Sequence, residues 1–491
     1  MVRQKINKIA FYRYRYPLAY ATFAVAMASM LLIAGFYLPG GLQQTEIDSA
    51  LVSDNLNPTQ LFNLKPNELV YLPYYLLQAA SISLFGVSLI GIKFASILLG
   101  FFSALGILYL LNLWYRRNVA IITAIIAVTT NQFLLSSQAG QAGIVYIFLT
   151  VMILIAASMI TRRSAYAKLC VLAGAILAAL SLYMPLNIYM LLALGFTALL
   201  HPHARHILIR KSAKPIVGIA TILFLIIISP LVIGIANDPS VLRTLLGIPS
   251  DFGNTKENIQ VLIRSYLLFH DPVTSVVITP VYGLGVVLLS FLGVYRLISA
   301  KYTAKSYILS FWLLLLIPLV CLNPGFISIT FVPVVLLIAL AIEYLIRSWY
   351  KLFPKNPYAR VFGLIPLSVL VAGLVISNID RYVYGLHYER AVYSTYNYDL
   401  TILDNRLKTA DENSSIILLV NEANQPFYES YARHQDHVKS LLVTTDTSLV
   451  TSKGLVIAEQ SAKKTIKNLP YEILVTRTAN NADRFYIYKN E

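Results

Sequence analysis

The sequence predicts an all-α polytopic membrane domain followed by a small α/β domain at the C-terminus. The first observation is composition: 57% of the 491 residues are apolar and 13% are charged, and the mean hydropathy is +0.67. These values lie outside the range of ordinary soluble proteins. The second is that apolar runs recur over residues 1–379, and the third is that short β-branched runs replace them over residues 380–491.

A transmembrane helix needs about 20 apolar residues, because each residue adds about 1.5 Å along the axis. The first run with this length follows a basic leader, as in a secretory signal. It is longer than the apolar region of such a signal, and no convincing cleavage site follows it, so we interpret it as a retained signal anchor. Eleven such runs are present, at residues 17–38, 89–113, 119–137, 143–161, 168–184, 186–200, 215–236, 276–298, 306–322, 326–346 and 360–379.

The basic residues predict the orientation of the chain. With eleven spans, 21 of the 39 Lys and Arg residues fall in the leader or in loops on one side, whereas the short opposite loops carry none. A single kinked helix over residues 168–200 would destroy this asymmetry, so the positive-inside rule favours two helices there. It also places the N-terminus in the cytoplasm and the C-terminal domain outside the cell membrane. The net charge of +16 therefore follows from topology, and nucleic acid is not an expected partner.

The acidic residues concentrate on the predicted outer face. Eight of the nine that precede residue 380 fall in two outer loops, 39–88 and 237–275. No charge is confidently placed at a bilayer midplane, which argues against an ion-coupled transporter. In the first loop, Tyr71, Tyr74 and Tyr75 belong to an apolar stretch interrupted by prolines, which we interpret as interfacial helices at headgroup depth.

The two outer loops contain the candidate site residues. Glu46 and Asp48 follow a Pro-Gly-Gly turn, and such a pair can divide labour, one acid deprotonating a hydroxyl while the other orients a substrate or a metal. The alternative is a solvated acidic turn that merely caps the next helix. Lys65 is expected at the height of a lipid phosphate, and Arg264 with His270 could stabilise a leaving phosphate, although solvated loop charges explain these residues equally well.

Residues 380–491 predict a small outer α/β domain. They carry 13 Lys and Arg residues and 14 Asp and Glu residues, so they are nearly neutral. Helical stretches are expected near 389–408 and 426–434. The predicted strands are Ile416 to Val420, Leu441 to Thr445, Leu455 to Ala458, Ile473 to Thr476 and Phe485 to Tyr488.

The order of these features resembles a known family. A basic leader, a first span, the acidic pair, and a Lys-Pro before Tyr-rich helices are followed by Leu84 to Ser88 and by Lys93 to Leu98 at the second span. This set resembles the polytopic GT-C glycosyltransferases, and most closely the branch of the protein O-mannosyltransferases and the aminoarabinose transferases of lipid A. The resemblance has landmarks over residues 17–200 and elsewhere rests on topology, including Phe331 to Pro333 in a late span.

The resemblance implies transfer of a sugar from a polyprenyl-phosphate donor to an extracytoplasmic acceptor, which can be an envelope lipid, a polysaccharide or a protein. In that family an acid of the first outer loop is the catalytic base. Counting back from Ala50, Glu46 matches the first of two adjacent acids, Ile47 replaces the second and Asp48 follows, so either acid can be the base. Lys65 matches the lysine that contacts the carrier phosphate, and Tyr71 is expected with it at the donor.

The loop at residues 136–143 lacks the second acid that this family often has there, so the use of a divalent metal stays open. Two other functions also stay open. One is a flippase or transporter of lipid-linked sugars, and the other is an inactive relative whose outer domain binds a polymer or a partner protein.

Overall fold

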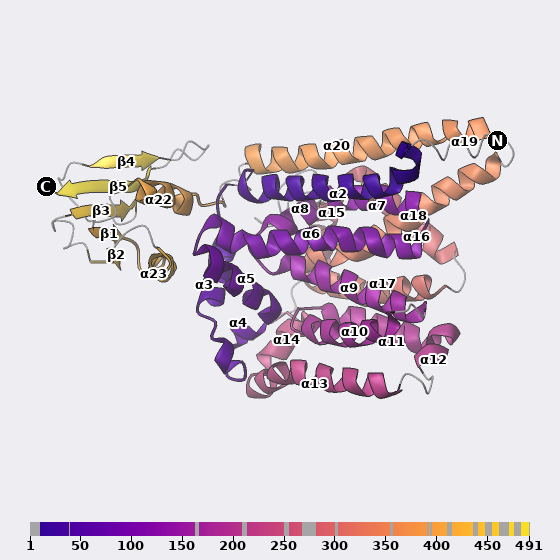
Figure 1. The fold of residues 1–491 in the computed structure, drawn as a ribbon, viewed down its shortest axis with the longest axis horizontal. Coiled ribbons are helices and arrows are strands. Elements are labelled where there is room, and N and C mark those ends of the chain that lie inside the picture. Colours follow the sequence, from indigo (N-terminus) through magenta and orange to yellow (C-terminus); the bar gives the residue numbers. More distant parts are fainter. Residues whose placement is uncertain are drawn as a thin grey trace.

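The computed structural model describes residues 10–38, 40–162, 166–208, 214–249, 255–267, 281–299, 303–353, 357–389, 392, 395–409, 415–435, 440–446, 454–460, 471–475 and 483–490. Helices that lie side by side form the larger part, and a five-stranded sheet with two helices lies beyond one end of this bundle (Figure 1). Between the two parts lie α3 (Gln44–Asp54), α4 (Pro66–Leu69) and α5 (Leu72–Phe85). The predicted fold class is confirmed.

Each of the eleven predicted spans overlaps a helix or a helix pair, although residues 276–280 of the span predicted at 276–298 lie outside the described residues. One pair, α7 (Arg117–Val128) and α8 (Asn131–Gln138), makes a bent span, and three apolar helices are shorter, α10 (Ala167–Ser181), α11 (Asn187–Leu200) and α16 (Leu284–Ser299). Over the described ranges, seven helices contain a stretch long and apolar enough to cross a membrane: α2 (Ala10–Phe36), α6 (Leu89–Trp114), α9 (Gly143–Thr161), α13 (Lys214–Asn237), α17 (Ala304–Leu322), α18 (Phe331–Leu352) and α20 (Leu364–Tyr388).

Helices α7 and α8 bend by 63° at two threonines. The hydroxyl of Thr130 accepts the N–H of Phe133 and begins α8, while the hydroxyl of Thr129 donates to the carbonyl of Ile125 at 3.0 Å. Hydroxyl groups that pair with freed backbone groups permit such a break within an apolar segment. The bend brings the loop 139–142 against α3.

Residues 167–200 form two helices, as the charge pattern predicts. Helix α10 packs against α9 and α13, whereas α11 packs against α17. The chain turns between them at Pro185 and Leu186, and the N–H of Leu186 donates to the carbonyl of Leu245 at 2.8 Å. Leu245 belongs to α14 (Ser240–Leu246), so this turn is held by the second outer loop.

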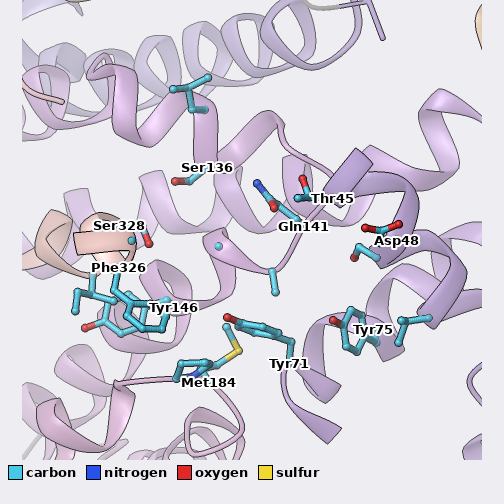
Figure 2. Close-up of a pocket in the computed structure, with 18 of the residues that line it drawn as sticks. Thr45, Asp48, Tyr71, Tyr75, Ser136, Gln141, Tyr146, Met184, Phe326 and Ser328 are labelled. Atoms are coloured by element: carbon cyan, nitrogen blue, oxygen red, sulfur yellow. The ribbon is translucent and has the colours of Figure 1, made fainter. Parts of the chain in front are cut away.

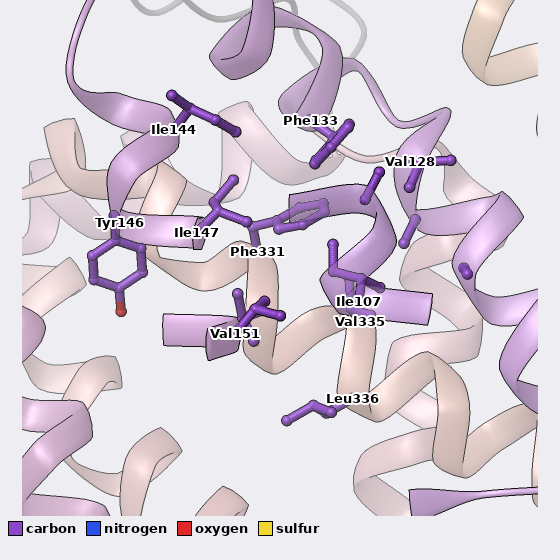
Figure 3. Close-up of a cluster of buried hydrophobic side chains, with 14 of the residues drawn as sticks. Ile107, Val128, Phe133, Ile144, Tyr146, Ile147, Val151, Phe331, Val335 and Leu336 are labelled. Carbon is purple, nitrogen blue, oxygen red and sulfur yellow. The ribbon is translucent and has the colours of Figure 1, made fainter. Parts of the chain in front are cut away.

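The core of the bundle lies where α6, α8, α9 and α18 meet. Phe133 of α8 stacks on Phe331 of α18 with ring centroids 5.5 Å apart, beside Ile144, Ile147 and Val151 of α9 (Figure 3). Lipid tails are as apolar as these side chains, so close packing rather than exclusion of water holds such helices together. This packing fixes the loop after α8, which forms part of the site described below.

The bundle has two distinct ends. Two short helices, α12 (Pro202–Leu208) and α19 (Pro357–Phe362), lie at the end away from the sheet, where α2 also begins (Figure 1). Both belong to the basic segments that the sequence assigns to the cytoplasm. The side of the membrane that each end faces stays a prediction.

The C-terminal domain contains the five predicted strands, in the order β2-β1-β3-β5-β4. In the described part of this domain the helices are α22 (Asp399–Lys408) and α23 (Gln425–Arg433). Of the helix expected over 389–408, α22 contains residues 399–408, and residues 390, 391, 393 and 394 lie outside the described residues. Helix α20 continues through the predicted boundary at residues 379/380 to Tyr388, and that boundary stays a prediction. Strand β1 (Ser415–Leu419) is parallel to β2 (Ser440–Thr444) and β3 (Gly454–Glu459), while β5 (Asp483–Asn490) is antiparallel to β3 and β4 (Glu472–Val475).

The C-terminal domain packs directly on α3 and its neighbours. One apolar core joins Leu42, Ile82 and Ile92 of the membrane domain to Leu403 and Tyr431 of the C-terminal domain. Unlike the packing inside a bilayer, burial of such a surface from water stabilises the contact by about 25 cal/mol for each Å². The C-terminal domain therefore forms a fixed wall beside the first outer loop.

Candidate active site

The chain enters α3 through two glycines that no larger residue can replace without strain. Gly40 has a φ of +58°, in the left-handed region that favours glycine. A Cβ on Gly41 would lie 2.7 Å from the carbonyl oxygen of Asn397. The glycine turn in the sequence thus permits close approach of the segment that leads into the C-terminal domain.

Glu46 caps α3 from inside the protein. Its side chain is fully buried, and Oε2 accepts the backbone N–H of Gln43 at 2.7 Å, the geometry of a capping box. Its Oε1 accepts the N–H of Gly140 at 2.5 Å and lies 3.6 Å from Nζ of Lys93. Both carboxylate oxygens are therefore engaged with protein groups. Glu46 does cap the helix, but it is buried and not solvated as the alternative to a catalytic pair has it.

Lys93 is the buried partner of Glu46, and no sequence pattern assigned it to the site. It lies in α6 with no exposed surface. Its Nζ donates to Oε1 of Gln138 at 3.3 Å and lies 5.7 Å from the ring centroid of Tyr396. A buried ammonium is costly unless it is paired. The available signal was a single lysine just inside an otherwise apolar span.

Gln78 connects the elements around this ion pair. Its Oε1 accepts the hydroxyls of Ser49 and Ser53 of α3 at 2.8 and 2.7 Å. Its Nε2 donates to the carbonyls of Ile92 and Gly140, each at 3.0 Å. Because all these groups are buried and paired, α3, α5, α6 and the loop after α8 form one rigid unit.

Asp48 lies on a different face of α3. Two residues along an α-helix correspond to a rotation of about 200°, so two side chains with this spacing point in nearly opposite directions. The Asp48 side chain is exposed, and its Oδ1 accepts Nε2 of Gln44 at 3.0 Å. Figure 2 shows Asp48 beside Thr45 and Tyr75 at one end of a cavity.

This cavity has a volume of about 620 Å³ and is bordered by α3, by the start of α5, by α8 and the loop after it, and by the start of α9. Polar, uncharged side chains line part of it, among them Gln141, Ser136 and Ser328, and aromatic and aliphatic side chains contribute most of the rest (Figure 2). Asp48 is the only charged residue among the described residues that line it. Its full lining is Thr45, Asp48, Ser49, Val52, Asn67, Tyr71, Tyr75, Gln132, Leu135, Ser136, Gln141, Ala142, Gly143, Tyr146, Met184, Pro185, Gly325, Phe326, Ser328 and Ile329.

Tyr71, an expected donor-binding residue, lies in the wall of this cavity. Its φ is +70°, a backbone conformation that costs roughly 1–3 kcal/mol outside glycine. The strain is offset locally because its N–H donates to the carbonyl of Tyr183 at 3.0 Å. Burial raises the pKa of Tyr71, and it raises the pKa of Tyr75 to about 12. Both phenols are therefore neutral hydrogen-bond donors at physiological pH.

The predicted cations lie outside the lining of the cavity. Lys65 is exposed at the start of α4, the helix whose Asn67 does line it, and its backbone N–H donates to Glu68 at 3.0 Å. Arg264 is exposed on α15 (Thr255–Leu267), which packs on the 3₁₀ helix η3 (Pro324–Thr330) that carries Phe326 and Ser328. His270 lies outside the described residues.

In the part of the chain that the structure describes, no three His, Cys, Asp or Glu side chains come together in a way that could hold a metal ion. The use of a divalent metal stays an untested prediction.

The sequence matches no protein-family model and no curated protein. The structure is similar to crystal structures of ArnT from Cupriavidus metallidurans, one in the apo state and one bound to undecaprenyl phosphate. The TM-score is 0.51 in both cases, with 12% and 11% sequence identity. The alignments cover 96% of this chain and 98% and 97% of the two ArnT chains. Over nearly its whole length, the chain therefore has the GT-C membrane fold of ArnT.

Proposed function

We propose that this chain is a multi-pass membrane glycosyltransferase that moves a sugar from a polyprenyl-phosphate donor to an extracytoplasmic acceptor. The observation that carries the proposal is the lone carboxylate of Asp48 at a 620 Å³ cavity between the first outer loop and the helical bundle. The ArnT fold supports it, because one of the similar ArnT structures holds undecaprenyl phosphate.

Asp48 is the general base in this proposal. A base must reach the proton that it removes, and it needs a free lone pair to accept it. Asp48 lines the cavity and, among the described residues, accepts a hydrogen bond from one amide only, whereas Glu46 has both oxygens engaged and no exposed surface. Glu46 is a structural residue in this account.

The reaction is a single displacement. Asp48 accepts the proton of an acceptor hydroxyl, and the oxygen attacks the anomeric carbon of the donor from the face opposite the phosphate. The bond between the anomeric carbon and the phosphate oxygen breaks, and polyprenyl phosphate leaves with the electron pair. No covalent enzyme intermediate forms, and the anomeric configuration inverts. The neutral phenols of Tyr71 and Tyr75 can donate hydrogen bonds to the sugar or the phosphate.

Lys65 and Arg264 are the proposed cations for the departing phosphate. Both are exposed, and each belongs to an element that is in contact with the cavity wall. Cations placed where charge develops stabilise the transition state more than the ground state. His270 is a further candidate from the sequence.

The cavity lies at the end of the bundle that carries the C-terminal domain (Figure 1). With the predicted orientation, this is the extracytoplasmic side of the cell membrane. A lipid donor fits this location, because its tail can stay among membrane lipids while its head group enters from the membrane edge.

The proposal is tested by incubating the purified protein in nanodiscs with a panel of undecaprenyl-phosphate monosaccharides and extracted envelope acceptors. Transfer of sugar is expected with one donor and is expected to disappear in Asp48→Asn. Transfer that survives loss of both Glu46 and Asp48 would contradict the mechanism. Absence of transfer with every donor would favour a transporter or a binding protein instead.

A further inference from the structure

Asp48 also lines a second space, on the face of α3 that is turned toward the C-terminal domain. This cleft has a volume of about 50 Å³ and lies between α3, the start of α22 and α23. Asp48 is thus shared between the large cavity and a narrow cleft whose other wall is the C-terminal domain. A general base in this position can meet the acceptor from one space while the donor occupies the other.

The walls of the cleft are held in fixed positions. Leu42 and Asn397 exchange two backbone hydrogen bonds, at 2.8 and 2.7 Å, beside the glycine turn that leads into α3. At the other end of α3, Asp54 accepts hydrogen bonds from Ser430 at 2.7 Å and from Arg433 at 2.8 Å. Since both ends of α3 are attached to the C-terminal domain, the cleft between them is a built feature of the fold.

The lining of the cleft suits hydroxyl groups. Gln44, Asn397 and Asn424 bring amides to it, and Asp399 adds a second carboxylate. Asn424 is itself oriented, because its Nδ2 donates to Oε1 of Glu459 at 2.7 Å. Amide side chains donate to and accept from sugar hydroxyls, and a carboxylate accepts from them, because a hydroxyl has both capacities. The apolar part of the wall comes from Leu42, Ile47, Leu51, Leu400, Phe427 and Tyr428.

The size and place of the cleft restrict what can enter. A water molecule occupies about 30 Å³ in the liquid, so a cleft of this size admits a hydroxyl-bearing edge rather than a bulky group. The cleft opens at the C-terminal domain, which lies beyond the end of the helical bundle (Figure 1). An acceptor that arrives there comes from water and not from within the lipid layer.

We propose that the cleft is the acceptor subsite and that the acceptor is a glycan, one of whose hydroxyls passes between α3 and α23 to reach Asp48. The inference rests on the proposed transferase function and deepens it. The glycan O–H gives its proton to Asp48, and its oxygen forms the new glycosidic bond. The donor sugar and its carrier occupy the large cavity, and the carrier phosphate leaves on that side.

Ala423 offers a way to close the cleft without altering Asp48 or its neighbours in α3. It is exposed and lies in the wall contributed by the C-terminal domain. Ala423→Leu and Ala423→Trp fill the cleft by increasing amounts, whereas Ala423→Ser leaves it open. Leu442→Trp, on the exposed side of β2, is the control for a large side chain elsewhere on the same domain.

The experiment measures transfer to oligosaccharides released from the cell envelope, with undecaprenyl-phosphate sugars as donors, together with binding of undecaprenyl phosphate alone. The expected result is a KM for the oligosaccharide that rises from Ser to Leu to Trp, by at least 10-fold for Trp, with unchanged carrier binding and melting temperature. Leu442→Trp is expected to behave as the unmodified protein does.

An unchanged KM in Ala423→Trp would overturn the acceptor subsite while leaving the transferase standing. Transfer to an envelope lipid or a protein, and to none of the oligosaccharides, would overturn the glycan class. Failure of the unmodified protein to transfer with any donor and acceptor would instead count against the transferase itself. If Ala423→Trp does not fold, Ala423→Leu still tests the acceptor subsite, because its KM for the oligosaccharide must then exceed that of Ala423→Ser.

Discussion

The two carboxylates of α3 are two residues apart in sequence and occupy opposite environments. Glu46 is fully buried against Lys93 and two backbone N–H groups, whereas Asp48 is exposed between a cavity and a cleft. The difference shows how a helix can separate support from chemistry. One acid fixes the helix, and the other stays free to exchange a proton.

The largest effect is expected for Asp48→Asn. The variant loses the base but keeps a side chain of the same shape, so transfer should fall by about 10² to 10⁴-fold. Stability should change by less than about 0.5 kcal/mol, because within the described residues this carboxylate accepts a hydrogen bond only from exposed Gln44. Steady-state transfer and thermal unfolding in the same detergent check both statements. A similar loss of activity that is accompanied by unfolding would point to a structural role.

Glu46→Gln should mainly affect stability. It leaves the ammonium of Lys93 buried without a counter-ion, which typically costs about 3–5 kcal/mol. Chemical denaturation of the two proteins measures this difference. The double variant Glu46→Gln with Lys93→Met removes both charges and should recover much of the loss. A single variant that is as stable as the unmodified protein would show that the pair is not a structural element.

Gly140→Ala should disturb the loop that holds Glu46. A Cβ at this position would lie 2.8 Å from Cγ2 and 3.1 Å from the carbonyl oxygen of Ile92, so the loop must move, at a cost of about 1–3 kcal/mol. Gly143→Ala is the matched control, since its Cβ would meet no atom within 4 Å. The melting temperatures of the two variants decide the question, and equal values would contradict close packing at Gly140.

Asp54→Asn should have the smallest effect. It weakens the ion pair with Arg433, whose side chain is 57% exposed, and such pairs contribute at most about 1 kcal/mol. The loss should shrink further as the salt concentration rises. Limited proteolysis of the C-terminal domain at low and high salt measures its attachment to α3. An effect of Asp54→Asn that is the same at low and high salt would contradict an electrostatic contribution from this pair, whereas the apolar core between the two parts is expected to hold in either case.

The parts that could be predicted from sequence are those that follow local periodicity or composition. The apolar runs predicted the helices of the bundle, and the charge asymmetry separated α10 from α11 although only a Pro-Leu turn divides them. The five strands were predicted because their β-branched runs are short and separated by polar residues. Helices and strands of this kind are determined mainly by residues that are close together in the sequence.

The arrangement of the site depends on contacts between distant residues, and it could not be predicted in the same way. Lys93 and Glu46 are 47 positions apart, and nothing local shows that the lysine turns inward to meet the acid. The choice between Glu46 and Asp48 stayed open because it depends on which face of α3 is covered by α6 and the loop after α8. The cleft is less local still, because its second wall includes Asn397, which is far from α3 in the sequence.

The central claim is most directly tested by comparing transfer, per folded molecule, by Asp48→Asn and by the double variant Glu46→Gln with Lys93→Met. The account predicts that transfer by folded Asp48→Asn, which still binds undecaprenyl phosphate, is lowered by about 10² to 10⁴-fold, and that the folded double variant keeps substantial transfer. Transfer by Asp48→Asn, together with none by a folded double variant, would contradict it and would assign the chemistry to Glu46.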